Sequence, residues 1–413
     1  MSAGGVLEGV LAVNKPNAIT STQVLRDLQR QFNPSKAFAP WLEAEQFRRS
    51  RENSNQKKRR RNRQAPQVKI GHGGTLDPLA TGVLITGIGK GTKQLQAFLD
   101  CTKTYEATVL FGVATDTYDR LGKVLHRAPH AHITREKVEE ALAQYRGKIM
   151  QRPPIFSALW VQGKRLYDYA REGKEIPGEI QERPVEVLEL EMAEWMEGGT
   201  HPHAWPSTEA PEEERDVAEK VFHTGKKEVA GTEQLAEVTP SIKRLREEST
   251  TDDLVHDVPT KRTKRDDEDT GVAPVMSGGL ATATSPTTAT SPSSTPPPPA
   301  DTPPQSPTSG APAPAPAAKL RMTVTSGFYV RSLCHDLGAA VGSRAIMSEL
   351  VRTRQGQFDL AKGNVLEYAQ LQDGEATWGP IVERLLGEWN EAGREGGEEG
   401  KKRAENADTT NQT

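Results

Sequence analysis

The sequence has 413 residues, a formal net charge of −3 and 35% hydrophobic residues, which is below the roughly 45–50% of a typical globular domain. Its two cysteines, Cys101 and Cys334, are too few for a disulfide framework or a cysteine-based zinc site. No apolar run approaches the ~20 residues of a membrane span, so we expect no membrane partner. The order of elements along the chain indicates which parts can build a core.

Residues 6–33 have the pattern of a strand, a turn and a helix. The stretch VLEGVLAVNKP at 6–16 is apolar and rich in β-branched residues. Thr20 or Ser21 then provides a suitable N-cap for a helix. The apolar face of this helix is formed by Val24, Leu25, Leu28 and Phe32.

A basic block interrupts this pattern at residues 34–66. Between 48 and 63, Glu52 is the one acid among the basic residues Arg48, Arg49, Arg51, Lys57, Lys58, Arg59, Arg60, Arg61 and Arg63. Such a block is typical of a solvated, flexible insertion. Two functional interpretations stay open: a nuclear import signal at KKRRR (57–61) and an arm that grips phosphates.

Residues 67–192 are expected to form a compact α/β region. The strand at 103–111 places one residue in two on a half-buried face, namely Tyr105, Ala107, Val109 and Phe111. Ile133 and Val138 flank Thr134 with the spacing of a hydrophobic staple, which predicts a helix start. Residues 183–192 are a further strand candidate.

Residues 198–318 contain too few apolar groups to offset the entropy of ordering, so we expect a disordered, low-complexity insertion. Structure is expected to resume at 319 with a strand and a helix whose apolar face is Val330, Leu333, Leu337 and Val341. Residues 391–413 are expected to be a disordered tail. We therefore predict a single domain that comprises 6–192 and 319–390.

The stretch GHGGTLDPLATGVL at 71–84 places Asp77 among glycines, threonines and small apolar residues. A phosphate-binding loop is disfavoured because no window matches the Walker pattern. When Asp77 is considered alone, an Asp-Pro turn is the favoured interpretation. A third interpretation is a catalytic loop set on a buried strand.

Five stretches together decide between these interpretations. GHGGTLDPLATGVL closely resembles the catalytic motif of the TruB family of pseudouridine synthases. The same family is resembled by VLAVNKPNAITS at 10–21, KTYEATVLFGVATDTYDRLGKV at 103–124, QRPPIFSALWVQGKRLYDYAREGKEI at 151–176 and SGFYVRSLCHDLG at 326–338. The resemblance covers roughly half of the chain, in the order of the family. Gly73, where many members carry threonine, is similar to the eukaryotic tRNA-modifying branch, to which the fungal enzymes belong.

The resemblance implies an α+β fold with a mixed, mainly antiparallel central sheet flanked by helices, interrupted by long disordered insertions. It implies an isomerase that converts a uridine of the tRNA T-arm loop, at position 55, to pseudouridine through base flipping. We expect no C-terminal RNA-binding domain of the PUA type, which many members carry, because few residues follow Val365. A guide-RNA-dependent enzyme of a ribonucleoprotein and an inactive tRNA-binding chaperone stay open as alternatives.

The reaction requires no cofactor and no metal, and we expect a monomer whose partner is tRNA. We expect a nuclear protein and leave open the mitochondrion and the cytoplasm. Modification of mRNA is expected as a further activity, while the full substrate range and the role of 198–318 stay undecided.

The resemblance also implies site residues. Asp77 becomes the nucleophile, acting at the sugar C1′ or, alternatively, at the base, and Arg331 becomes the cation that keeps it ionised. Tyr105 becomes the ring that stacks on the target base. The candidate substrate-binding residues are His72, Tyr329, Leu350, Lys15, Lys164 and Arg165. Of these, Lys15 fits a backbone contact better than catalysis, and Lys164 and Arg165 are expected on a phosphate-facing helix.

Overall fold

The computed structural model describes residues 5–53, 65–172, 176–212, 215 and 314–410. All of these residues belong to one unit of the chain, Met1–Leu254 with Ala313–Thr413, here called the first unit.

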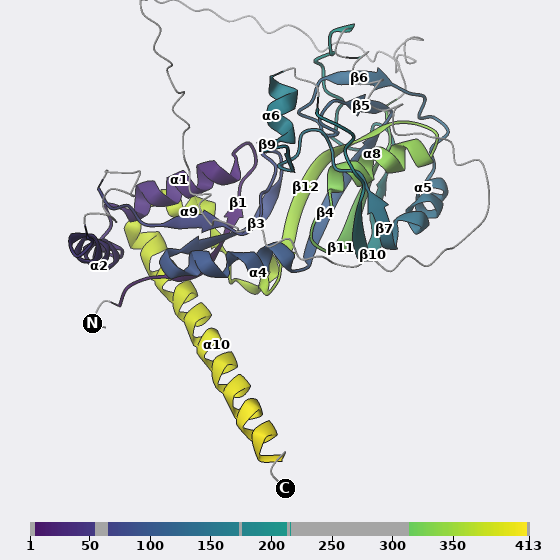
Figure 1. Ribbon diagram of the computed structural model, residues 1–413. Helices are drawn as coiled ribbons and strands as arrows, with labels where there is room; N and C mark the ends of the chain where they lie inside the picture. Colours follow the sequence, from purple (N-terminus) through teal and green to yellow (C-terminus); the bar gives the residue numbers. More distant parts are fainter. Residues whose placement is uncertain (1–4, 54–64, 173–175, 213–214, 216–313, 411–413) are drawn as a thin grey trace, which may run out of the picture. The chain divides into compact units, whose positions relative to one another are not determined.

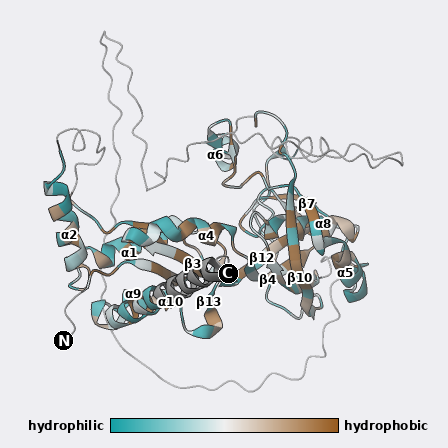
Figure 2. Cartoon of the chain, turned by 60° about the horizontal axis from the view of Figure 1, so that its bottom comes forward, coloured by the Kyte–Doolittle hydropathy of each residue, from teal (hydrophilic) through white to brown (hydrophobic). Residues whose placement is uncertain are grey.

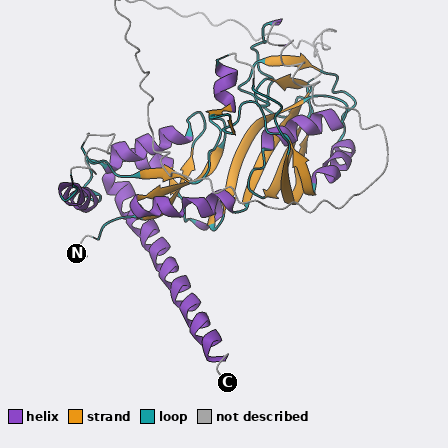
Figure 3. Ribbon diagram, in the orientation of Figure 1, coloured by secondary structure: helices purple, strands orange, loops and turns teal. Residues whose placement is uncertain are grey.

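A mixed sheet forms the centre of the first unit (Figures 1 and 3). Its strands follow the order β14-β1-β3-β12-β4-β11-β10-β7, with β2 paired to β3 and β13 paired to β12. Only the β1–β14 and β3–β12 pairs are parallel, and the others are antiparallel. This arrangement confirms the predicted α+β class with a mainly antiparallel sheet.

The strands of this sheet are β1 (Gly9–Lys15), β2 (Ile70–His72), β3 (Thr81–Ile88), β4 (Lys103–Phe111), β7 (Gly147–Gln151), β10 (Arg183–Met196), β11 (Ala317–Val324), β12 (Ala345–Gln355), β13 (Phe358–Asp359) and β14 (Leu366–Glu367). Two hairpins lie outside it: β5 (Val113–Thr115) with β6 (Val124–Arg127), and β8 (Trp160–Val161) with β9 (Lys164–Arg165).

The α-helices are α1 (Ser21–Phe32), α2 (Ala39–Ser50), α4 (Leu95–Asp100), α5 (Arg135–Leu142), α6 (Leu166–Arg171), α8 (Val330–Ala340), α9 (Tyr368–Gln372) and α10 (Glu375–Thr410). Helix α8 packs on β12 and β4, and α5 packs on β10 and α8. No helix in the described part of the chain is both long and apolar enough to cross a membrane.

The first strand and helix form as the sequence predicts. Thr20 is the N-cap of α1, and its side chain accepts a hydrogen bond from the Gln23 N–H. The four predicted apolar residues of α1 are all buried. Thr134 likewise caps α5, with Ile133 and Val138 buried beside it.

Two apolar layers cover the β1–β3 part of the sheet. On β1, Leu11 and Val13 belong to the main core, whereas Val10 and Ala12 belong to a second cluster on the opposite face. Figure 2 shows the apolar strands of this part lying between more polar helices. The strand that carries the 71–84 motif is therefore buried on both faces, which makes it a rigid support for the loop before it.

The basic block at 34–66 was predicted to be a flexible insertion, and this is wrong for its first half. Helix α2 begins within the block, and Trp41 is buried against the core. Phe38 is fully buried and stacks on Phe32 with 4.3 Å between ring centroids. These two aromatic residues anchor the segment, which the count of charges did not reveal. Residues 54–64, including KKRRR, lie outside the described residues.

The boundaries of the 198–318 insertion and of the tail also differ from prediction. Residues 198–212 pack on the domain, and β11 begins at Ala317, because small alanines pair with β4. The expected tail at 391–413 is helical in backbone as far as Thr410, as a continuation of α10, whose first part is anchored in the core by Trp378, Val382 and Leu386. The predicted disorder of 216–313 concerns residues outside those described.

Candidate active site

Asp77 lies in a turn at the entrance to β3. Its carbonyl oxygen accepts a hydrogen bond from the Ala80 N–H at 3.0 Å, which closes the Asp-Pro turn. Gly82, just beyond it, has a φ of +100°, and a Cβ there would lie 2.3 Å from the Arg352 carbonyl oxygen. The turn therefore presents the Asp77 side chain, 31% exposed, from a backbone that is fixed at its base.

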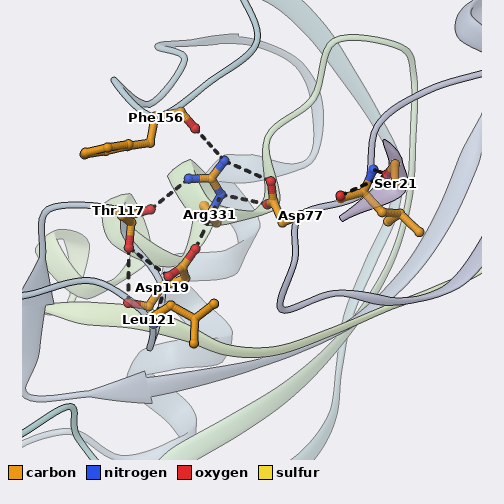
Figure 4. A network of polar contacts seen from close by, with 8 residues as sticks. Ser21, Asp77, Thr117, Asp119, Leu121, Phe156 and Arg331 are labelled. Atoms are coloured by element: carbon orange, nitrogen blue, oxygen red, sulfur yellow. Dashed lines mark hydrogen bonds and ion pairs between the residues drawn. The ribbon is translucent and has the colours of Figure 1, made fainter. Parts of the chain in front are cut away.

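Arg331 holds this carboxylate with both arms of its guanidinium (Figure 4). Its Nε donates to Asp77 Oδ2 at 2.8 Å and its Nη2 to Asp77 Oδ1 at 3.2 Å. The remaining donors reach the carbonyl oxygens of Thr117 and Phe156, each at 2.9 Å. The Arg331 side chain is 7% exposed, so the pair combines a buried cation with a carboxylate that solvent or substrate can reach.

A second carboxylate, Asp119, lies 4.0 Å from Arg331 Nε on the turn between β5 and β6. Burial raises the pKa of Asp119, while hydrogen bonds from Thr117 and the charge of Arg331 oppose that rise. Its Oδ1 accepts hydrogen bonds from the Thr117 hydroxyl and the Leu121 N–H (Figure 4). Arg331 therefore lies between two carboxylates and two carbonyl oxygens.

Lys15 supports the Asp-Pro turn from the buried side. Its side chain is fully buried, and Nζ donates to the carbonyl oxygens of Pro16 and Ile19 at 2.8 Å and of Pro78 at 3.3 Å. Burial lowers the pKa of Lys15 to about 8, although the charge of Asp77 opposes this. These contacts tie the Lys-Pro turn to the Asp-Pro turn, in agreement with the backbone contact that its sequence context favours.

The other predicted pocket residues differ in how deeply their side chains are buried. Tyr105 and Leu350 come from the paired strands β4 and β12 and belong to the same buried cluster as Leu76 and Leu79, which flank Asp77. Tyr105 is 8% exposed and Leu350 is 6% exposed. Both side chains are therefore buried in the main core. Strand β12 pairs with the start of β3 at Thr81 and Gly82, just after the Asp77 turn.

Tyr329 and His72 are placed by backbone contacts. Tyr329 is the N-cap residue of α8, and the Gln151 side chain bonds both its N–H and its carbonyl oxygen. His72 ends β2 opposite Thr86 of β3. Tyr329 thus helps to fix the start of the helix that carries Arg331, and His72 begins the glycine-rich part of the loop.

Lys164 and Arg165 were predicted to lie on a helix, and this is wrong. They form strand β9 of a short hairpin, and α6 begins only at the next residue. The turn of this hairpin uses Gln162 and Gly163, both with positive φ, a conformation that the sequence analysis did not consider. Lys164 lies over the Tyr169 ring at 5.2 Å, and Arg165 lies over the Trp160 ring at 5.0 Å.

The sequence analysis gave no role to Thr117, Asp119 or Phe156, which complete the surroundings of Arg331. Asp119 stands in the T-D-T-x-D-x-x-G stretch that carried part of the resemblance, so its position was a usable signal. The carbonyl oxygens of Thr117 and Phe156 carried no such signal, because backbone contacts depend on the folded path of the chain and not on residue type.

Asp336 lies on the same helix as Arg331. Burial raises its pKa to about 6, Glu182 raises it further and Arg152 opposes the rise. Because the folded-state pKa exceeds the ordinary value of 3.8, the cost of burying this charge is absent below about pH 4 and complete above about pH 6. The folded protein is therefore destabilised by Asp336 at neutral pH.

We expect Asp336→Asn to increase the free energy of unfolding at pH 8 by about 1–3 kcal/mol, and the gain to vanish as the pH approaches about 4. Urea denaturation across this range measures the effect. Asp100→Asn, at an exposed helix end, is the matched control and should change little. An equal gain at both ends of the pH range would show that the charge of Asp336 is not its cause.

Within the described residues, no group of three or more His, Cys, Asp or Glu side chains could hold a metal ion. The described site itself holds the Asp77 carboxylate paired with Arg331. A carboxylate so placed can act as a nucleophile or as a base.

Comparison with known proteins gives consistent matches. Residues 59–204 match the TruB family pseudouridylate synthase (N terminal domain), and residues 331–386 match the tRNA pseudouridylate synthase B C-terminal domain. The chain is 38% identical to tRNA pseudouridine synthase 4 of Schizosaccharomyces pombe over 374 residues, which cover 88% of this chain and 82% of that protein.

The corresponding Saccharomyces cerevisiae protein, tRNA pseudouridine synthase 4, is 30% identical over 92% of this chain and 85% of its own length. A bacterial tRNA pseudouridine synthase B, from Acaryochloris marina, is 47% identical over 32% of this chain and 44% of its own length. A solved Cbf5-Nop10-Gar1 complex aligns with a TM-score of 0.41 and 18% identity over 92% of this chain and 59% of that chain.

Proposed function

Because this chain belongs to the TruB family of pseudouridine synthases, we propose that it is the enzyme that isomerises uridine 55, in the T-arm loop of tRNA, to pseudouridine. The two fungal relatives that match most of its length are both tRNA pseudouridine synthases. The observation that carries the proposal is the exposed carboxylate of Asp77 held by the buried guanidinium of Arg331.

In the proposed reaction, an oxygen of Asp77 forms a bond with C1′ of the target nucleotide. The bond between C1′ and N1 of uracil breaks, and its electron pair leaves with the base. The detached uracil turns and bonds C1′ through C5, Asp77 departs, and the proton on C5 is removed while N1 gains one. Atoms and electrons balance without an oxidant or a reductant. Attack at the base is the alternative that this scheme must be tested against.

Arg331 aims the Asp77 carboxylate, because its Nε and Nη2 donate to both carboxylate oxygens. Because its Nη1 and Nη2 also donate to the carbonyl oxygens of Thr117 and Phe156, the guanidinium does not have to reorganise when the bond to C1′ forms.

The target base must leave its stack to reach Asp77, which costs a few kcal/mol and is offset by stacking and hydrogen bonds in the pocket. We assign the stacking surface to Tyr105 on β4 and the pocket wall to Leu350 on β12, which pairs with β4 and with the start of β3 after the Asp77 turn. His72 and Tyr329 flank the same loop and helix start, and we assign them to holding the flipped nucleotide.

The β8–β9 hairpin supplies a surface for the rest of the RNA. Trp160 is 55% exposed and carries the Arg165 guanidinium over its ring. Aromatic faces next to cations suit unstacked bases and their phosphates. Lys164 and Arg165 therefore keep their proposed role in RNA binding, from a hairpin.

The proposal is tested by incubating the purified full chain with an unmodified tRNA transcript and mapping pseudouridine at each position. We expect product at position 55 without any guide RNA, and none in a transcript with cytidine at that position. Product that requires a guide RNA would favour a ribonucleoprotein enzyme. Tight tRNA binding without product would favour a chaperone. Structured mRNA fragments assayed in the same way test whether mRNA is a second substrate.

We further propose that the chain is imported into the nucleus through residues 57–63, on the strength of KKRRR at 57–61. Deleting 57–63 is expected to shift a fluorescent fusion of the full chain from the nucleus to the cytoplasm. Replacing the same residues with a Gly/Ser stretch of equal length controls for the change in length. Unchanged nuclear localisation in both variants would remove this role.

A further inference from the structure

Arg331 contacts a turn whose position is fixed by a neighbouring strand. The turn at 116–122 joins β5 to β6 and presents the Thr117 carbonyl oxygen and Asp119 to Arg331. On its other side, β12 grips it: the Met347 N–H donates to the Tyr118 carbonyl oxygen at 2.9 Å, and the Arg120 N–H donates to the Met347 carbonyl oxygen at 3.1 Å. The position of Arg331 therefore depends on that of a small surface hairpin.

Residues 201–210, here called the strap, run along this hairpin. The Val124 N–H donates to the Thr208 carbonyl oxygen at 2.8 Å, and the Ala210 N–H donates to the Val124 carbonyl oxygen at 2.9 Å. Val124 and Glu209 form a parallel β-bridge. The strap thereby adds a short strand to the free edge of β6, which would otherwise be left with unpaired backbone groups.

Trp205 fastens the strap at the other end of the hairpin. Its indole N–H donates to the Phe111 carbonyl oxygen at 2.8 Å, where β4 leads into β5. Gly112 has a φ of +88°, and a Cβ there would lie only 2.6 Å from Trp205 Cζ2. The ring also meets His130 edge-on and lies 5.2 Å from the Arg127 guanidinium carbon. Position 112 therefore requires glycine for two reasons: its positive φ, and the clash that a Cβ would make with the Trp205 indole.

His203 fastens the strap to β12 beside the residue that grips the turn. Its Nδ1 lies 3.3 Å from the Ser348 hydroxyl oxygen and 3.9 Å from a carboxylate oxygen of Glu349. Its side chain is 11% exposed. Ser348 directly follows Met347, so this contact lies one residue from the backbone pair that holds Tyr118 and Arg120.

We propose that the strap is a positioning element of the active site, and that Trp205 and His203 are positioning residues. They hold the β5–β6 hairpin so that its turn keeps Thr117 and Asp119 against Arg331. The strap lies within the 198–318 insertion, which contains none of the family motifs. The proposal therefore gives a part of this insertion a role in the reaction. This inference rests on the proposed role of Arg331, because that residue transmits the effect to Asp77.

The test compares single-turnover pseudouridine formation, tRNA affinity and hydrogen exchange of the turn amides in four variants of the full chain. Trp205→Ala and His203→Ala are expected to slow turnover by about 10- to 100-fold, since small misplacements of catalytic groups have effects of that order. Affinity for tRNA should stay nearly unchanged, because phosphate contacts dominate it. The amides of Asp116, Tyr118, Arg120 and Gly122 should exchange faster.

His203→Asn can place a side-chain amide near Ser348 and should recover much of the lost rate. Trp41→Ala is the control: it removes another packed indole, since Trp41 is buried and Trp205 partly buried, but Trp41 lies beside Gly89, at the end of β3 opposite to Asp77. It should lower thermal stability without changing turnover or exchange at the turn. Equal losses of rate in Trp41→Ala and Trp205→Ala, or full rate in both strap variants, would overturn the proposal.

The exchange measurement also separates this inference from the proposed function. If the wild-type chain made no pseudouridine at position 55, the proposed function would fail. Unchanged protection of the turn amides in Trp205→Ala would in any case refute the strap. If Trp205→Ala does not fold, the same measurements are made on His203→Ala. This variant removes a smaller contact, near the turn end of the β5–β6 hairpin.

Discussion

Asp77→Asn is expected to abolish turnover while the chain stays folded and binds tRNA with nearly normal affinity. Asparagine has the same shape, and the turn that presents it is closed by the backbone bond from Ala80. A neutral amide cannot displace uracil from C1′, so we expect single-turnover rates to fall on the order of 10⁴-fold or more, as for other nucleophile replacements. The measurements are single-turnover formation of pseudouridine and tRNA binding by filter retention.

The control for this experiment is Asp100→Asn, which makes the same chemical change at the exposed end of α4 and should keep full activity. Circular dichroism and thermal melting of both variants check the fold. A rate within about tenfold of wild type in Asp77→Asn would exclude covalent attack by this carboxylate. Loss of tRNA binding together with turnover would indicate that Asp77 serves binding instead.

The elements of the fold that the sequence predicted well are those with local signals. The helix at Ser21–Phe32 combines a capping threonine with four apolar residues at helical spacing. Strand β4 was identified by the alternation that includes Tyr105 and Val109. Both signals depend on residue type and spacing alone, and each element buries the residues that the pattern selects.

The elements that the sequence missed are stabilised by distant contacts. Helix α2 packs through Phe38 and Trp41, whose partners come from both ends of the chain, including Trp378. The strap has few apolar residues and was grouped with the low-complexity insertion. It packs because β6 offers it a free backbone edge and Gly112 leaves room for Trp205. The composition of residues 201–210 alone does not indicate that they pack at this position.

The candidate site was predicted in its residues but not in its arrangement. Asp77 and Arg331 are 254 residues apart in the sequence and still form a bidentate pair. Nothing in residue spacing indicates this pairing, and only the resemblance to a family suggested it. The resemblance did not show that Lys15 is buried beneath the turn, nor that Arg331 also binds two carbonyl oxygens.

Arg331→Lys is expected to reduce turnover by about 10²–10³-fold, although it keeps the positive charge. The planar guanidinium reaches Asp77 with two donors and the carbonyl oxygens of Thr117 and Phe156 with the others. A lysine ammonium is a point charge and cannot satisfy all of these partners at once. The Asp77 carboxylate would lose its fixed direction, and the Phe156 or Thr117 carbonyl oxygen would be left without its donor. Single-turnover rates and urea denaturation together measure the two consequences.

Arg344→Lys is the matched control, because Arg344 is exposed shortly after the end of the same helix and should tolerate the change. The double variant Asp77→Asn with Arg331→Lys distinguishes a shared role from two separate ones. If Arg331 acts only through Asp77, adding its substitution to Asp77→Asn should reduce the residual rate little further, since residues that act as a unit are not additive. If the two losses of rate multiply in the double variant, Arg331 would instead have a contact with the substrate that is independent of Asp77.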